Sequence, residues 1–196
     1  MKVPNRPVKV PDRPRLLGID DGPFTKGVDA TTALVAVFME GPDRVEGVAI
    51  RPFPIDGEDA TAFLARWIGE LRFRPACHGV VLGGITLAGL AVVDLAELAE
   101  RTGLPVIAVS RRDPSAHRVA DALAAAGLTT RLPVLERAPK PFAVDGSLYA
   151  SVAGTSEDRA RALVLATRGK SAFPEPLRVA HLIAAAVARG SSRGRA

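Results

Sequence analysis

The chain has 196 residues, of which 47% are hydrophobic, 24% are charged and one is cysteine, and its formal net charge is +5. This composition excludes an intrinsically disordered chain, a collagen-like repeat and an intrachain disulfide, and the length suits one domain. No apolar stretch is long enough to span a membrane, and the lone thiol leads us to expect a reducing, cytoplasmic compartment.

The positive charge is concentrated at the two ends of the chain. Residues 1–15 carry five basic residues and one acid, and the segment from 189 onward carries three arginines, which leaves a net charge of −2 on the body. We therefore expect a basic flexible arm at 1–15, one folded domain at 16–190 and a tail at 191–196. Each end is either a solvated tail or an arm that contacts phosphate. We favour phosphate contact for the N-terminal arm and solvation for the C-terminal tail.

The first part of the body predicts three strands. An apolar run over 15–20 ends at two aspartates before a Gly-Pro turn, a second run covers 31–39, and a partly alternating third run covers 44–55. The links between these runs are short. We therefore expect an antiparallel meander.

The rest of the chain alternates between helical periodicity and short apolar runs. Helices are predicted over 59–73, 91–101, 114–126, 156–167 and 174–188. Strands are predicted at 79–82 and 105–109, with one or two more within 132–152. This succession predicts an α/β fold of the ribonuclease H-like type, in which a mixed central sheet, a three-strand meander plus parallel strands, is flanked by helices. The first and fourth strands then lie side by side, so acids at their ends can share metal ions.

The strongest local signal is the pair Asp20-Asp21, which a strand delivers to a Gly-Pro turn. A carboxylate on a rigid strand end suits Mg²⁺, and adjacent strand residues face opposite sides of a sheet, so we favour Asp20 as the ligand. The alternative is that both aspartates only form the turn. Asp56, after the third strand, either faces the same metal or begins the next helix.

Two further segments carry candidate residues. The glycine-rich loop that contains Gly84 and Thr86 is either a phosphate cradle at a helix N-terminus or a site of close packing on the sheet. Asp94, in the next helix, is explained by the helix dipole alone. Arg178 and His181, three residues apart on the last helix, either lie near a carboxylate cluster or a phosphate, or are solvated.

Five segments follow one another along the body: GIDDGPF (18–24), DGEDAT (56–61), GITLAGLAVVD (84–94), TGLPVIAVSRR (102–112) and PEPLRVAHLI (174–183). Together they resemble the endonuclease dU family, also called domain of unknown function ninety-nine, over residues 16–190. That family is similar to endonuclease V. The resemblance implies a ribonuclease H-like fold and Mg²⁺- or Mn²⁺-dependent cleavage of DNA near deaminated bases such as deoxyuridine.

The resemblance also implies roles for individual residues. Asp20 and Asp56 match metal-binding acids after the first and third strands. Arg111 matches a lysine that endonuclease V places on the phosphate side of its site. Arg178 and His181 fall where endonuclease V has a His-Arg pair, and these five residues are the predicted catalytic set. Nucleic-acid contacts are expected from Gly84, Thr86, Arg111 and Arg112.

The sequence departs from endonuclease V at Gly83, where that protein has a third metal-binding aspartate. Either Asp21 or Asp94 completes the metal site, or metal binding is weakened or lost. The alternative function is therefore a catalytically weak nucleic-acid or nucleotide binding module of the same fold. The segment 18–22 also resembles the first phosphate loop of actin-like ATPases, but the chain is too short for the two domains that such proteins need.

Overall fold

The structure, a computed structural model, describes residues 10–111 and 116–193. Its strands are β1 (Arg15–Asp21), β2 (Thr31–Glu40), β3 (Arg44–Pro54), β4 (Gly79–Leu82), β5 (Thr86–Leu87), β6 (Ala91–Val92), β7 (Val106–Ser110), β8 (Phe142–Asp145) and β9 (Leu148–Ala153). Its α-helices are α1 (Ala60–Glu70), α2 (Leu95–Thr102), α3 (Ala116–Ala125), α4 (Leu132–Glu136), α5 (Glu157–Ala166) and α6 (Glu175–Arg189). None of the helices in these ranges is long and apolar enough to cross a membrane.

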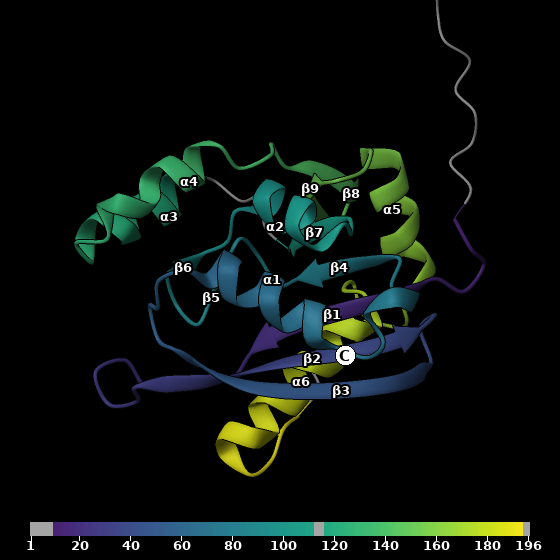
Figure 1. Ribbon diagram of the computed structural model, residues 1–196, viewed down its shortest axis with the longest axis horizontal. Coiled ribbons are helices and arrows are strands. Elements are labelled where there is room, and N and C mark those ends of the chain that lie inside the picture. The colour runs from purple at the N-terminus through teal and green to yellow at the C-terminus, as the bar shows by residue number, and fades with distance from the viewer. Residues whose placement is uncertain (1–9, 112–115, 194–196) are drawn as a thin grey trace, which may run out of the picture.

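The main sheet of the described residues runs in the order β3-β2-β1-β4-β7-β9-β8. β1, β2 and β3 form an antiparallel meander, and β4 and β7 continue parallel to β1. This confirms the predicted α/β architecture, in which a meander leads into parallel strands. Because β1, β4 and β7 are parallel neighbours, their carboxyl ends lie together at one end of the sheet (Figure 1).

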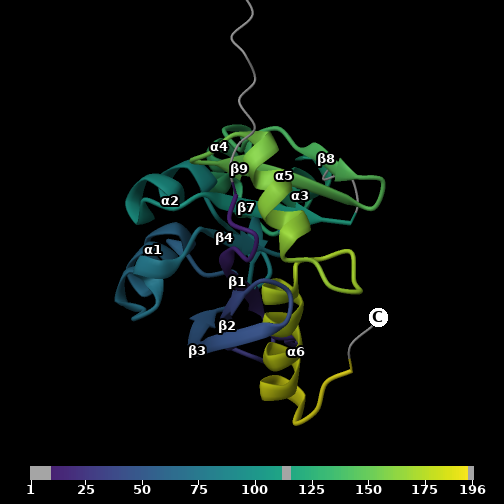
Figure 2. The same ribbon diagram turned by 90° about the vertical axis from the view of Figure 1, so that its right-hand side faces the viewer.

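Helices cover both faces of this sheet (Figures 1 and 2). α1 and α2 cover one face, where Leu17 and Ile19 of β1 share a buried core with residues such as Leu64 and Leu98. α5 and α6 cover the other face, in a second core that contains Leu16, Leu163 and Leu177. The alternation along β1 therefore sends successive side chains to two different helical layers.

Glycine allows α6 to pack directly on β1. A Cβ at Gly18 would clash with the backbone of Pro176, and a Cβ at Gly22 would lie 2.9 Å from the carbonyl oxygen of Ala184. Gly18, Asp20 and Gly22 share one face of the strand, because side chains alternate along it. The backbone of α6 thus lies close to β1 on both sides of Asp20, in space that side chains at positions 18 and 22 would otherwise fill.

The glycine-rich segment after β4 differs from the prediction. Ala91 and Val92 form β6, which pairs with β5 in a hairpin, and α2 begins only at Leu95. Since a hairpin separates the glycines from the helix, Gly84 and Thr86 do not lie at a helix N-terminus, which the phosphate-cradle alternative required. A short apolar run fits a buried strand as well as a buried helix, so periodicity alone does not separate the two.

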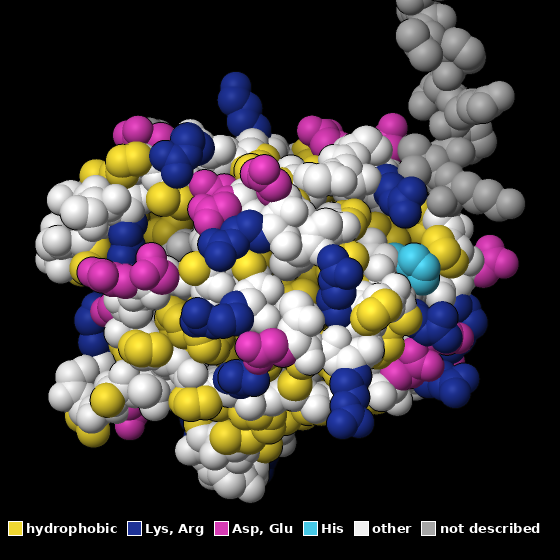
Figure 3. Space-filling view, in the orientation of Figure 1, with side chains coloured by type: hydrophobic (Ala, Val, Ile, Leu, Met, Phe, Trp, Pro, Cys, Tyr) yellow, Lys and Arg dark blue, Asp and Glu magenta, His cyan; other side chains and the backbone are white. Residues whose placement is uncertain are grey.

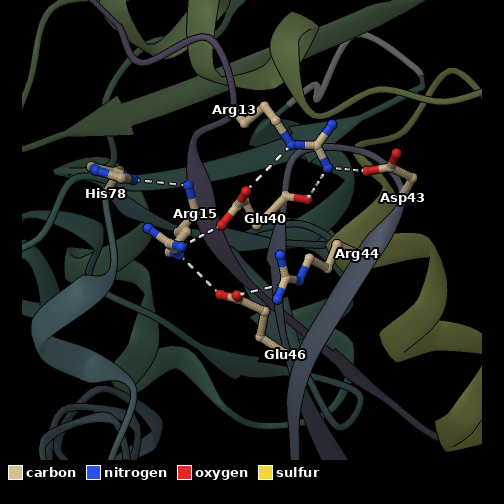
Figure 4. A network of polar contacts seen from close by, with 7 residues as sticks. All are labelled: Arg13, Arg15, Glu40, Asp43, Arg44, Glu46 and His78. Carbon is tan, nitrogen blue, oxygen red and sulfur yellow. Dashed lines mark hydrogen bonds and ion pairs between the residues drawn. The ribbon is translucent and has the colours of Figure 1, made fainter.

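The last residues of the predicted N-terminal arm are part of the folded body (Figure 4). Arg13 pairs with Glu40 and Asp43, and Arg15 pairs with Glu40 and Glu46. This network lies at the start of β1, about 17 Å along the strand from its carboxylate-bearing end. These two arginines are therefore committed to acidic partners, whereas residues 1–9 lie outside the described part of the chain.

Candidate functional site

The carboxyl ends of β1, β4 and β7 open into a cavity of about 830 Å³ beside α6. Asp20 and Gly83 line it from the strand ends, Arg111 lines it after β7, and Arg178 and His181 line it from α6. The fold thus brings four of the five residues of the predicted catalytic set to one hollow. They come from the first strand, the middle and the last helix of the chain.

An aspartate and a histidine form the centre of this cavity. Asp20 Oδ2 and His181 Nδ1 lie 2.8 Å apart, although 161 residues separate them in the sequence. The hydrogen bond to the Asp20 carboxylate raises the pKa of His181, because the imidazolium form donates the proton on Nδ1 to an anion. The pair therefore holds a proton more firmly than an isolated histidine does.

Gly83 provides the space that the Asp20 carboxylate occupies. A Cβ at position 83 would lie 2.9 Å from Asp20 Oδ1, which is closer than real Cβ contacts. The position at which the sequence departs from endonuclease V therefore lies directly against the candidate metal ligand. An aspartate at this position needs a shift of the Asp20 side chain.

Two arginines of the cavity are held by neighbouring groups. Arg178 donates from Nε and Nη2 to Glu175 Oε2, at 2.8 Å and 2.6 Å. Glu175 is only 7% exposed, so its carboxylate is a fixed anchor. The Arg111 guanidinium lies over the ring of Phe173, 5.0 Å from its centroid. Glu175 was missed in the sequence, although its three-residue spacing from Arg178 on a helix is a signal for an ion pair.

Asp21 makes its contacts away from this cavity. Its carboxylate accepts a hydrogen bond from the backbone of Ala88 at the tip of the β5–β6 hairpin. Burial, and then the negative charge of Asp20, raise the pKa of Asp21 to about 6. Asp21 therefore changes its protonation state just below neutral pH.

Asp56 ties two loops together. Its Oδ1 accepts a hydrogen bond from the backbone N–H of Leu90 at 2.8 Å, and its Oδ2 pairs with Lys26 Nζ at 2.9 Å. Burial opposes ionisation here, but the hydrogen bonds from Lys26 and Leu90 outweigh it and lower the pKa of Asp56. Both carboxylate oxygens thus hold the loop after β1 against the β5–β6 hairpin.

Asp94 is the N-cap of α2. Its Oδ1 accepts hydrogen bonds from the backbone N–H groups of Ala96 and Glu97, both at 3.0 Å, and its Oδ2 pairs with Arg137 at 3.3 Å. Within residues 10–111 and 116–193, no group of three or more His, Cys, Asp or Glu side chains could hold a metal ion. The structure therefore does not gather the four predicted metal ligands, Asp20, Asp21, Asp56 and Asp94, into one cluster.

The predicted nucleic-acid contacts are divided between locations. Gly84 lines a second cavity of about 260 Å³, whose other lining residues are mostly apolar. Thr86 lies in the short strand β5, and Arg111 lines the first cavity. Arg112 lies outside the described residues.

Relatives of similar length match almost the whole chain. The UPF0215 protein of Methanothermobacter thermautotrophicus is 38% identical, over 93% of this chain and 91% of that protein. The UPF0215 protein of Thermococcus sibiricus is 37% identical, over 94% of this chain and 97% of that protein.

Solved structures share the fold. A protein of unknown function from Archaeoglobus fulgidus aligns with a TM-score of 0.81 at 32% identity, over 89% of this chain and 98% of that one. Endonuclease V of Ciona intestinalis, solved with a 24mer DNA that contains an inosine followed by a ribo-adenosine, aligns with a TM-score of 0.52 at 12% identity, over 86% and 82% of the two chains. Endonuclease V of Streptomyces avermitilis aligns with a TM-score of 0.52 at 19% identity, over 91% and 82%. The predicted ribonuclease H-like fold is thereby confirmed.

The family itself is identified by a model that spans nearly all of the folded body. The model described as Endonuclease dU matches residues 12–188. This range contains all the elements from β1 to α5 and almost all of α6. The chain therefore belongs to the endonuclease dU family.

Proposed function

We propose that the protein is a divalent-metal-dependent endonuclease that cleaves DNA beside deaminated bases such as deoxyuridine. The observation that carries this proposal is the hydrogen-bonded pair of Asp20 and His181 in a cavity lined by guanidinium groups. Such a site combines a proton-carrying group with cations that bind and stabilise a phosphodiester. Membership of the endonuclease dU family supports the same assignment.

Asp20 fits a hydrated Mg²⁺ or Mn²⁺ that the substrate helps to hold. Mg²⁺ usually keeps several waters and binds through one or two carboxylates together with substrate phosphates. Oδ2 of Asp20 is bonded to His181, whereas Oδ1 faces the backbone of Gly83 and receives no hydrogen bond from a described residue. When bound, the cation would polarise the phosphodiester and lower the pKa of a bound water.

The side chains around Asp20 bind and orient the phosphate. His181 donates from Nδ1 to Asp20, which leaves Nε2 as the ring nitrogen that carries a proton toward the leaving oxygen. Arg111 and Arg178 bind the non-bridging oxygens, and the contacts with Phe173 and Glu175 keep their guanidinium groups in place. Each role falls on a residue that lines or supports the same cavity.

The second cavity provides a place for the base. Gly84 and Ser110 line it, whereas their chain neighbours Gly83 and Arg111 line the first cavity, so the two hollows flank the ends of β4 and β7. Enzymes that act at a particular base commonly take it out of the stack and enclose it between apolar side chains. In this proposal the phosphodiester occupies the first cavity and the deaminated base the second.

The test is cleavage of a labelled oligonucleotide that contains one deoxyuridine, next to a matched oligonucleotide with thymidine. We expect cleavage of the uracil strand alone, with Mg²⁺ or Mn²⁺ and not with EDTA. Asp20→Asn should lower the rate at least about 100-fold. Glu100→Gln, the same chemical change on the exposed surface of α2, should leave it unaltered. Cleavage that survives Asp20→Asn would contradict the proposed site.

A second candidate function is a catalytically weak nucleic-acid binding module. Gly83 favours it, because glycine supplies no third carboxylate beside Asp20. The same oligonucleotides separate the two functions. Binding of the uracil strand without cleavage in any of the metals supports the module and contradicts the endonuclease.

A further inference from the structure

The C-terminal segment 190–193 turns back and runs beside α6 (Figure 2). Gly190 ends the helix in the left-handed conformation, with φ at 74°, and its N–H donates to the carbonyl oxygen of Ala186. This backbone geometry reverses the chain, as glycine at the end of a helix commonly does. Ser191, Ser192 and Arg193 consequently line the same cavity as Asp20. The segment that the sequence analysis assigned to solvent is a wall of the candidate site.

This wall adds positive charge to the cavity. Arg189 and Arg193 line it together with Arg111 and Arg178, whereas Asp20 is the only acid among the described residues that line it. Arg178 already pairs with the buried carboxylate of Glu175, which balances part of its charge. Neither Arg189 nor Arg193 forms an ion pair with an acid among the described residues, so their charges are available to a ligand.

The spacing of His181 and Arg189 along the backbone of α6 favours a long anion over a small one. Arg189 follows His181 by eight residues on α6, which is about 12 Å along the helix axis. One strand of DNA rises about 3.4 Å for each nucleotide, so 12 Å corresponds to roughly three nucleotides. A single phosphate bound at Asp20 is too small to reach the far end of this wall, whereas a nucleic-acid strand presents a phosphate at every step.

We propose that segment 190–193, together with Arg189, is a phosphate-binding strap of the nucleic-acid site. Its two guanidinium groups, those of Arg189 and Arg193, bind backbone phosphates of the strand about three nucleotides from the phosphodiester at Asp20. The inference rests on the proposed function, because it takes nucleic acid as the occupant of the cavity. Phosphate contacts carry no sequence information, so the strap contributes affinity and register rather than choice of base.

The experiment measures the salt dependence of DNA binding by the full chain in EDTA, which prevents metal-dependent cleavage. Affinity for a 20-nucleotide uracil-containing duplex is followed between about 50 and 200 mM salt. Replacing Arg189 and Arg193 together by alanine removes two phosphate contacts. The slope of log affinity against log salt should then flatten by about 1.8, which makes the affinity loss over this range roughly tenfold smaller. Arg189→Lys with Arg193→Lys keeps both charges and should retain the slope of the unmodified protein.

The matched control is the pair Arg66→Ala with Arg72→Ala. These two exposed arginines lie on and just after α1. Figure 3 shows one face of the molecule on which cationic and anionic side chains are interspersed. The control removes the same net charge and should leave the slope unchanged. A dinucleotide, too short to extend from Asp20 to the strap, should bind the alanine variant and the unmodified protein equally. Thermal melting of each variant establishes that it is folded.

Three outcomes would overturn the strap: an unchanged slope in the folded alanine variant, an equal flattening in the control pair, or an equal loss of affinity for the dinucleotide. If any of these outcomes is found and the unmodified protein still cleaves the uracil strand, the strap proposal is refuted and the proposed function stands. If the unmodified protein binds no DNA even at about 50 mM salt, both the strap and the proposed function are contradicted, because nonspecific phosphate contacts are strongest at low salt.

Discussion

Replacing Asp21 by asparagine is expected to stabilise the protein above pH 6. Burial and the charge of Asp20 raise the pKa of this carboxyl from 3.8 to about 6 in the folded chain. A group whose folded pKa exceeds its unfolded pKa contributes its full stability below the unfolded value, and that contribution is lost as the pH rises through the folded value. The loss therefore falls between about pH 4 and pH 6. Raising the pKa from 3.8 to about 6 corresponds to about 3 kcal/mol of lost stability at high pH. Asparagine avoids this loss because it does not ionise.

The assay is urea denaturation of both proteins from pH 4 to pH 8 in EDTA, so that no cation near Asp20 alters the titration. At pH 8 the variant should exceed the unmodified protein by about 3 kcal/mol in free energy of unfolding, or roughly 6–12 °C in melting temperature. Near pH 4 the difference should vanish. Asp121→Asn, on the exposed surface of α3, is the control and should show no such pH dependence. An equal difference at both pH values, or a less stable variant at pH 8, would refute the reasoning.

Three further substitutions test the packing of α6, the cap of α2 and the metal site. Gly18→Ala should lower the free energy of unfolding by about 3 kcal/mol, because the new Cβ meets the backbone of α6, and urea denaturation measures this loss. Asp94→Ala should cost about 1 kcal/mol through loss of the helix N-cap while calorimetric Mn²⁺ affinity stays the same; a weaker affinity would make Asp94 a ligand. Gly83→Asp should raise Mn²⁺ affinity, because it adds a carboxylate beside Asp20, and calorimetry that finds no increase would rule out a missing ligand at this position.

The sheet was predictable because its signals are local. β1 ends at Asp21, directly before Gly22 and Pro23, and the change from alternation to helical periodicity after β3 marks the first helix. The helix ends also carry local signals, because serine is a common N-cap and glycine a common C-cap: Ser156 accepts a hydrogen bond from the backbone of Arg159, and Gly103 ends α2 in the left-handed conformation. The β5–β6 hairpin was not predictable, because two-residue strands leave no periodicity to detect.

The candidate site was predictable only in part, because several of its contacts depend on residues far apart in the sequence. Asp56 looked like a strand-end carboxylate, but its oxygens meet Lys26 and Leu90, which no local pattern connects with it. Arg189 and Arg193 looked like part of a solvated tail because their sequence carries no apolar residue to anchor them. The reversal at Gly190 places Arg193 beside the cavity, whereas Arg189 lines it from the last turn of α6.

The distance along the chain between Asp20 and His181 has a consequence for synthesis. Among the described elements β1 is synthesised first and α6 last, and the pair forms only when the helix docks on Gly18 and Gly22. Domains generally acquire such long-range contacts late, once the intervening chain is available. A nascent chain that ends before α6 therefore holds the carboxylate without its imidazole. The Asp20–His181 pair is therefore complete only after α6 has been synthesised and has packed on β1.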